Sequence, residues 1–356
     1  PKEETWTGIR AGQKGAVSEY GADQAYAFDE FEGLLPELLC GCERLYYPIA
    51  RNQAFDQVIL TAYSQARGQV RRGVTATDQL LDIESLVHQM RVIKSPAELE
   101  LMRYANQTSS KAHELAMRAC KPNMNEYELE AVFKGYCFSQ GCDDMAYTPI
   151  VGGGKNACIL HYIDNNQKIN DGDLVLIDAG GEYQGYSSDI TRTFPSNGKF
   201  SAEQKAVYEV VLAAQNEVIE MVKPGVTWNS LQARTVQCIT QGLVDLGILK
   251  GNVAQLIEDK AYVDFYMHLS GHWLGLDTHD AGRYCRQDEW QILMPGMTFT
   301  VEPGIYIPAG SKVDERWWDI GIRIEDNIVV TDEGSLNLTT VPKQVAEIEA
   351  LMASKK

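Results

Sequence analysis

Two aspartates interrupt apolar, strand-like segments at positions where a core residue would be expected. Asp178 closes the run LVLI, and Asp189 opens a second run, DITRTF. Burying a lone carboxylate costs so much free energy that a folded chain normally protonates it or pairs it with a positive group. The sequence therefore predicts that something cationic lies against both side chains.

These two segments are expected to pair as a hairpin with its turn at Tyr183 and Gln184, because Asp178 and Asp189 are equally distant from that turn. Directly opposed side chains in such a hairpin lie about 5 Å apart, and like charges there repel each other. A bound cation would turn the repulsion into attraction.

A second pair of acids repeats the arrangement. Glu302 in TVEPG and Glu325 in RIEDN are equally distant from the polar loop SKVDER. Any one of the four acids alone would be interpreted as a strand-end residue that caps a loop. All four together, paired within two hairpins, predict a metal site.

Three histidines lie close to the second pair of acids. His268, His272 and His279 fall within MHLSGHWLGLDTHD. His268 and His272 are four residues apart, but the Glu of an H-E-x-x-H helix is absent, and the Gly and Ser residues favour strand and loop. Carboxylates with an imidazole favour Mn, Co, Fe or Zn. Two ions roughly 3.5–4 Å apart could hold a hydroxide that attacks an amide, so the pattern predicts metal-assisted hydrolysis.

The chain has 356 residues, which is enough for two domains. Capping signals at Ser95, Asn125 and Ser201 predict three helix starts, and a fourth helix is expected from about Thr227 to Gly247. Helices followed by acid-bearing strands occur twice, which indicates a sheet built from two related halves.

Charge and apolar content exclude several classes of protein. The formal net charge of −17 argues against a nucleic-acid partner, which would need a basic patch. No apolar run approaches the roughly 18 residues of a membrane span, and the start, PKEETWTGIR, lacks a signal-peptide core. The eight cysteines show no C-x-x-C spacing and suit free thiols in a reducing compartment. We expect a cytoplasmic protein with no membrane partner.

Five ordered motifs resemble the pita-bread metallopeptidases, and most closely the aminopeptidase P (Xaa-Pro aminopeptidase) family. They are GDLVLIDAG, GYSSDITRTF, HLSGHWLGLDTHD, PGMTFTVEPGIY and GIRIEDN. The resemblance implies an α+β fold, with two related helix and strand halves around a curved antiparallel sheet. It also implies a partial α/β N-terminal lobe and connector at residues 1–90 and a catalytic domain at residues 91–356.

The resemblance further implies the roles of individual residues. Two divalent ions, usually Mn²⁺, would be held by five ligands: Asp178, Asp189, His272, Glu302 and Glu325. Asp189 and Glu325 would bridge the ions, and Glu302 would also accept a proton from the attacking water. The implied catalytic residues are His161, His268, His279, Glu302 and Arg323, and the implied proline pocket is formed by His268, Tyr306 and Arg323.

Residue patterns alone leave three of these roles open. Arg323 lies two residues before Glu325, so on a strand both face the same side, where Arg323 could hold a ligand carboxylate or form a surface ion pair. Tyr306 in GIYI suits a core position as well as a site. His161 has only its polar neighbours in favour of a site.

The activity implied is exopeptidase hydrolysis, by a metal-bridged hydroxide, of the N-terminal Xaa-Pro bond in peptides with proline at the second position. The alternatives are an Xaa-Pro dipeptidase (prolidase) and a non-catalytic pita-bread binding protein. Trp273, directly after His272, favours the aminopeptidase. About 85 residues precede the catalytic region, roughly half of the N-terminal lobe that the resemblance implies. A homo-oligomer, either a tetramer or a dimer, is expected if that lobe is complete.

Overall fold

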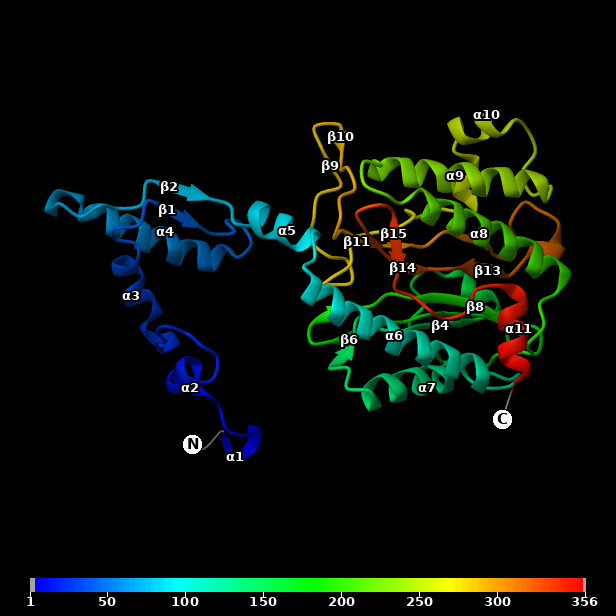
Figure 1. The fold of residues 1–356 in the computed structure, drawn as a ribbon, viewed down its shortest axis with the longest axis horizontal. Coiled ribbons are helices and arrows are strands. Elements are labelled where there is room, and N and C mark those ends of the chain that lie inside the picture. Colours follow the sequence, from blue (N-terminus) through cyan, green and yellow to red (C-terminus); the bar gives the residue numbers. More distant parts are fainter. Residues whose placement is uncertain (1–3, 355–356) are drawn as a thin grey trace. The chain divides into compact units, whose positions relative to one another are not determined.

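A computed structural model describes residues 4–354 of the chain, shown as a ribbon in Figure 1. Contacts divide the chain into two compact units, Pro1–Val87 and His88–Lys356.

The first unit packs helices against a small parallel sheet. Its elements are α1 (Glu4–Thr7), α2 (Gly12–Ser18), α3 (Phe31–Leu38), β1 (Arg44–Tyr46), α4 (Gln53–Gly68) and β2 (Gln79–Leu81), and α5 (Glu84–Val92) contains the boundary between the units. β1 and β2 pair in parallel, with Leu45 opposite Leu80, and α4 connects them. Leu35 and Ile59 belong to the small apolar core of this unit.

The second unit places its strands between two pairs of helices (Figure 1). Its helices are α6 (Pro96–Ala119), α7 (Glu126–Ser139), α8 (Ala202–Met221), α9 (Trp228–Asp245), α10 (Val253–Glu258) and α11 (Val345–Ala353). Its first strands are β3 (Asp144–Met145), β4 (Ile150–Gly153), β5 (Leu174–Asp178), β6 (Gly181–Tyr183), β7 (Tyr186–Ser187) and β8 (Thr191–Pro195). The others are β9 (Cys285–Arg286), β10 (Glu289–Trp290), β11 (Thr298–Val301), β12 (Gly304–Ile307), β13 (Ile320–Arg323), β14 (Asp326–Val330) and β15 (Ser335–Asn337).

The helix starts expected from the sequence are confirmed. Ser95, Asn125 and Ser201 are the N-caps of α6, α7 and α8, and each forms a capping box with the residue three positions later. Thr227 is the N-cap of α9. These boxes satisfy backbone N–H groups that have no partner inside the helix, so short polar signals were enough to locate the starts of three helices.

The register expected for the first hairpin is wrong. Asp178 lies opposite Thr191, not opposite Asp189. The cause is the turn, because Gln184 and Gly185 have φ angles of 49° and 81°, and a two-residue hairpin turn with positive φ at both positions fits the strand twist. The turn therefore lies at Gln184–Gly185. The pairing shifts by two residues, which preserves the side-chain parity of both aspartates.

The second hairpin has the expected register. β12 pairs with β13 so that Gly304 lies opposite Arg323, and the same register continues into the β11–β14 pair. Glu302 and Glu325, which lie between these strand pairs, are therefore opposite each other. A bridge between Thr191 and Glu325 joins this hairpin to the first one.

The aromatic residue that favoured an aminopeptidase lies in the core. Trp273 is 0% exposed and packs with Trp228 and Phe299 in an apolar cluster beneath the second hairpin. It therefore supports the loop that carries His272 rather than contacting the cavity.

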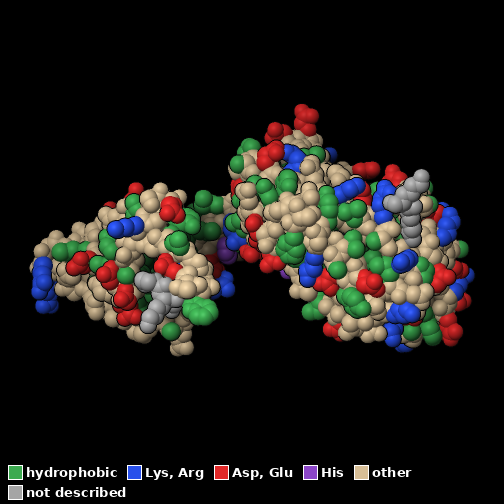
Figure 2. All heavy atoms as spheres, turned by 90° about the horizontal axis from the view of Figure 1, so that it is seen from below, with side chains coloured by type: hydrophobic (Ala, Val, Ile, Leu, Met, Phe, Trp, Pro, Cys, Tyr) green, Lys and Arg blue, Asp and Glu red, His purple; other side chains and the backbone are tan. Residues whose placement is uncertain are grey.

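On the face drawn in Figure 2, acidic and basic side chains are interspersed over the described residues of both units. Within residues 4–354, none of the helices has the length and apolarity needed to span a bilayer.

Candidate metal centre and active site

Nine of the ten side chains expected at the site line one cavity of about 640 Å³ in the second unit. They are His161, Asp178, Asp189, His268, His272, His279, Glu302, Arg323 and Glu325. These residues are separated by up to 164 positions in the sequence, so the two hairpins and the loops beside them bring the charges together.

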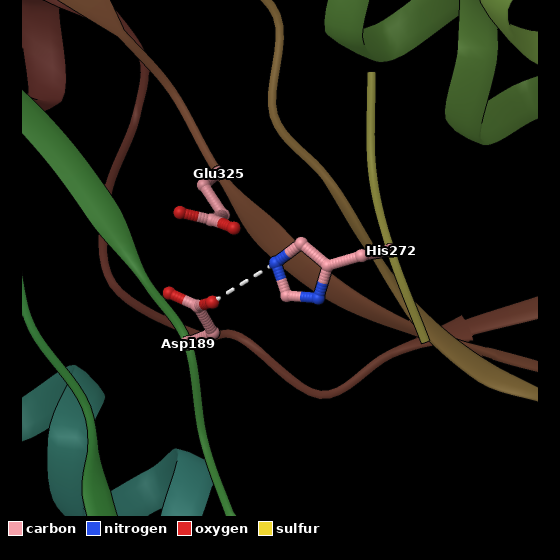
Figure 3. Close-up of side chains that lie close together, drawn as sticks. All are labelled: Asp189, His272 and Glu325. Atoms are coloured by element: carbon pink, nitrogen blue, oxygen red, sulfur yellow. Dashed lines mark ion pairs between the residues drawn. The ribbon is translucent and has the colours of Figure 1, made fainter. Parts of the chain in front are cut away.

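Asp189, His272 and Glu325 form the tightest group (Figure 3). One potential ligand atom from each lies within 4.8 Å of the others. His272 Nε2 is 3.2 Å from Asp189 Oδ2, and the other ring nitrogen, Nδ1, is 3.0 Å from the carbonyl of Trp273. With Nδ1 donating to that carbonyl, Nε2 is the ring nitrogen on the side of the carboxylates and the one that could bind a cation there.

Asp178 and Glu302 complete the set of acids around this group. Glu302 Oε1 is 3.6 Å from His272 Nε2. The hydroxyl of Tyr147 donates to Asp178 Oδ1 and lies 2.5 Å from Asp189 Oδ1, so one phenol connects the two aspartates. The four carboxylates and one imidazole thus line the same cavity.

Glu325 has one oxygen with a partner and one without. Its Oε2 accepts a hydrogen bond of 2.7 Å from Thr191 Oγ1. Its Oε1 is buried and has no hydrogen-bond partner among the described residues. An unpartnered buried carboxylate oxygen is costly unless something absent from the polypeptide binds it.

Burial in this cluster of acids raises the pKa of most of them. Burial, followed by the charges of Asp189 and Glu302, raises the pKa of Glu325 well above its usual range. Burial raises the pKa of Glu302 to about 7, against the opposing charge of His272. Burial also raises the pKa of Asp178. The polypeptide alone therefore lacks the positive charge needed to keep all four acids ionised.

Asp189 and His272 behave as an ion pair. Burial acts to raise the pKa of Asp189, but the hydrogen bond and charge of His272 outweigh burial and lower it. Burial acts to lower the pKa of His272, but Asp189 raises it to about 9. In the polypeptide, the imidazolium occupies the role that a divalent cation would take.

Arg323 connects the acids to a second histidine. Its Nη2 donates to Asp178 Oδ2 at 2.6 Å, and its Nη1 donates to the hydroxyl of Tyr306 at 2.8 Å. That hydroxyl lies 2.9 Å from His268 Nε2. Arg323 is 3% exposed, so the surface ion-pair interpretation is wrong, and its guanidinium holds the carboxylate of Asp178.

Tyr306 is the expected site residue that does not line the cavity. It is 0% exposed and lies behind the wall, where its hydroxyl joins Arg323 to His268. Burial and the charge of Arg323 lower the pKa of His268 to about 4, so its ring is neutral at ordinary pH.

His161 and His279 are the exposed histidines of the cavity. The ring of His279 meets that of His272 edge to face, with centroids 4.3 Å apart. His161 follows the 3₁₀ turn Gly154–Cys158. Neither ring belongs to the tight Asp–His–Glu group, so both are free to face a ligand in the cavity.

Three residues at the site were missed by sequence reasoning. Tyr147 and Thr191 bond the acids directly, and Thr300 Oγ1 accepts from the backbone N–H of His272 and lies 3.4 Å from Glu302 Oε1. The positions two residues from Asp189 and from Glu302 on their strands could have identified both threonines, since residues at that spacing share a face. No comparable signal marks Tyr147.

The donor set fits divalent metal ions. Four carboxylates and a correctly oriented imidazole are ligands that Mn²⁺, Co²⁺, Fe²⁺ or Zn²⁺ accept. A cation among them would also satisfy Glu325 Oε1 and offset the burial and mutual repulsion that raise the acid pKa values.

Comparisons with known proteins agree with this chemistry. The sequence model of metallopeptidase family M24 matches residues 100–332, and that of the aminopeptidase P N-terminal domain matches residues 1–46. The Xaa-Pro aminopeptidase of Escherichia coli K12 is 44% identical over 354 residues, which cover 99% of this chain and 80% of that protein. Human Xaa-Pro aminopeptidase 3 is 37% identical over 359 residues, which cover 99% of this chain and 68% of the human protein.

Solved structures give the same result. Pseudomonas aeruginosa aminopeptidase PepP has a TM-score of 0.96 and 48% identity, covering 100% of this chain and 81% of that one. A zinc-substituted E. coli aminopeptidase P in complex with product has a TM-score of 0.95 and 44% identity, with 100% and 81% covered. The family model, the sequence relatives and the shared fold agree: this chain is a member of metallopeptidase family M24 and has its pita-bread fold.

Proposed function

We propose that this enzyme is an Xaa-Pro aminopeptidase, which removes the first residue from peptides whose second residue is proline. The observation that carries the proposal is the convergence of four acids and an imidazole in one cavity, with an unpartnered buried oxygen on Glu325. Relatives that cover nearly the whole chain carry this name, which favours the aminopeptidase over the dipeptidase alternative.

The proposed metal ligands are Asp178, Asp189, His272, Glu302 and Glu325, and Asp189 and Glu325 would be shared between two ions. Bound divalent ions would supply Lewis-acid polarisation of the scissile carbonyl and acidify an attacking water. Glu302, whose Oε1 lies 3.6 Å from His272 Nε2, would accept the proton of that water and pass it to the leaving amine.

The remaining polar residues would act on the substrate. His161 and His279 would orient the scissile carbonyl and stabilise the charge that develops on its oxygen. His268 and Arg323 would contact the proline residue, and Tyr306 would hold both of them in place from behind the wall. An Xaa-Pro bond has no N–H, so recognition must use ring shape and carbonyl contacts instead.

Several finer assignments belong to the same proposal. Mn²⁺ is the proposed ion, since oxygen-rich ligand sets suit it. We also propose a homodimer or homotetramer and a catalytic domain at residues 91–356 after a lobe at 1–90. A cytoplasmic location is proposed as well, since the eight cysteines show no C-x-x-C spacing. Sedimentation velocity would test the assembly, and cell fractionation would test the location.

One assay tests the activity. The enzyme should release the first residue of the tripeptide Ala-Pro-Ala, lose this activity in EDTA and regain it when Mn²⁺ is added. Mass spectrometry of Ala-Pro-Ala and of the dipeptide Ala-Pro separates an aminopeptidase from a dipeptidase. Hydrolysis that continues unchanged in chelator would contradict the metal assignment, and cleavage of the dipeptide alone would contradict the aminopeptidase.

A further inference from the structure

The loop that carries His279 is closed by hydrogen bonds at its base. The backbone N–H of Asp280 donates to the carbonyl of Trp273 at 2.9 Å, and Thr278 Oγ1 donates to the carbonyl of Ala146 at 3.1 Å. The loop therefore begins next to His272 and ends directly after His279. Whatever fixes its last residue, Asp280, also fixes the position of the His279 backbone.

Two positively charged side chains bind the carboxylate of Asp280. Its Oδ2 accepts from Lys94 Nζ at 3.1 Å, and the side chains of both residues are only 1% exposed. Its Oδ1 accepts from Arg91 Nη2, which also donates to Asp277 Oδ2 at 2.6 Å. Both cations come from the segment that leads into α6.

Lys94 is itself held firmly. Its backbone N–H donates to the carbonyl of Gly296 at 2.9 Å, and the residue before it, Ile93, forms a β-bridge with Met297. Gly275 leaves room for the pair, because a Cβ there would lie 2.2 Å from Asp280 Oδ2 and 2.9 Å from Lys94 Cε. The chain thus reserves space for this contact within the loop.

A buried ion pair of this kind is a poor source of stability. The desolvation penalty of two buried charges often equals or exceeds their attraction, and apolar replacements are commonly as stable. The pair does, however, define one geometry. The ion pair connects Lys94, whose backbone is hydrogen-bonded to Gly296, to Asp280 at the end of the loop that carries His279.

We infer that Lys94 and Asp280 are positioning residues, whose buried ion pair sets the place of His279 beside the reacting carbonyl. The inference rests on the role of His279 given under Proposed function. It assigns the pair an effect on the rate that passes through His279, the residue directly before Asp280.

A double-mutant cycle tests this inference in the Mn²⁺-loaded enzyme with Ala-Pro-Ala as substrate. Lys94→Met should lower kcat by roughly 10- to 100-fold, the cost of misplacing a catalytic group by about 1 Å, while the metal content stays unchanged. With His279→Ala already present, Lys94→Met should lower kcat by less than about twofold. With His161→Ala present instead, it should keep its full effect.

The outcomes are distinguishable. If the double variant Lys94→Met with His279→Ala loses kcat by the product of the two single losses, the positioning role alone is overturned. A Lys94→Met enzyme with the same kcat as the original chain would also overturn only that role. A His279→Ala enzyme with unchanged kcat would overturn both this inference and the role of His279. If Lys94→Met does not fold, Asp280→Asn replaces it in the same cycle. Lys111→Met, at an exposed position on α6, should keep full activity.

Discussion

At the scale of single residues, Thr191 has an influence that its size does not suggest. Its hydroxyl donates to Glu325 Oε2 at 2.7 Å and accepts from Arg323 Nε at 3.2 Å. These two hydrogen bonds fix Oε2 of Glu325. The other oxygen, Oε1, has no hydrogen-bond partner among the described residues and is available to an incoming ligand. We expect Thr191→Val, which keeps the shape and removes the hydroxyl, to weaken Mn²⁺ binding by about 10- to 100-fold.

Titration calorimetry with Mn²⁺ would measure this change, and Thr191→Ser is the matched control because it keeps the hydroxyl. The serine variant should bind the metal nearly as well as the original chain. Equal Mn²⁺ affinity in the valine and serine variants would show that Glu325 needs no such partner.

The chemistry of the acidic residues was predictable from the sequence, but their supporting contacts were not. Carboxylates in apolar strands are costly wherever they occur, so Asp178 and Glu325 stand out without a structure. Tyr147 and Tyr306 do not, because a tyrosine among apolar residues is an ordinary core residue. Only the fold shows that one hydroxyl joins two aspartates and the other joins Arg323 to His268.

At the scale of elements, one buried carboxylate organises the segment that carries His161. Glu126, the first residue of α7, is 0% exposed. It accepts four hydrogen bonds of 2.7–2.9 Å, from the backbone of Gly153 and Gln167 and from the side chains of Asn156 and Tyr162. These donors lie on both sides of His161 in the sequence, so Glu126 ties the whole segment to the start of a helix.

Glu126→Gln should destabilise this segment, because its amide presents N–H groups to donors that need an acceptor. We expect the free energy of unfolding to fall by about 1–3 kcal/mol, the cost of leaving buried donors unsatisfied. Hydrogen exchange should rise in residues 154–168. Glu128→Gln, on the exposed side of the same turn, should change stability by less than about 0.5 kcal/mol, since Gln also completes a capping box. Equal stability of the two variants would contradict this role of Glu126.

The two hairpins show which features of an element a sequence determines. In the second hairpin, symmetry of the acids about a polar loop gave the correct register. In the first hairpin, the same reasoning gave a register that is wrong by two residues. The turn lies at Gln184 and Gly185, which both have left-handed backbone conformations. Strand identity follows from apolar pattern, whereas register follows from turn conformation. A tight turn with glycine at its second position was the signal that should have decided it.

At the scale of the whole molecule, a histidine outside the cavity should make global stability depend on pH. His113 on α6 is 0% exposed, its Nε2 is 3.1 Å from the carbonyl of Ala179, and its Nδ1 has no partner among the described residues. Burial, together with the charge of Arg192, lowers the pKa of His113 to about 3. The folded chain therefore keeps this ring neutral at a pH where the unfolded chain would protonate it.

The sign of the effect follows from this difference in proton binding. Above about pH 6.5 the ring is neutral in both states, and below it the unfolded state binds more protons, so stability falls as pH falls towards 3. Between pH 6.5 and pH 5 this group should remove about 2 kcal/mol from the free energy of unfolding. Urea unfolding of the EDTA-treated protein at a series of pH values would measure the slope. His113→Gln should lose that part of the slope while keeping the part due to the acids, and parallel curves for the two proteins would show that protonation of His113 does not oppose folding.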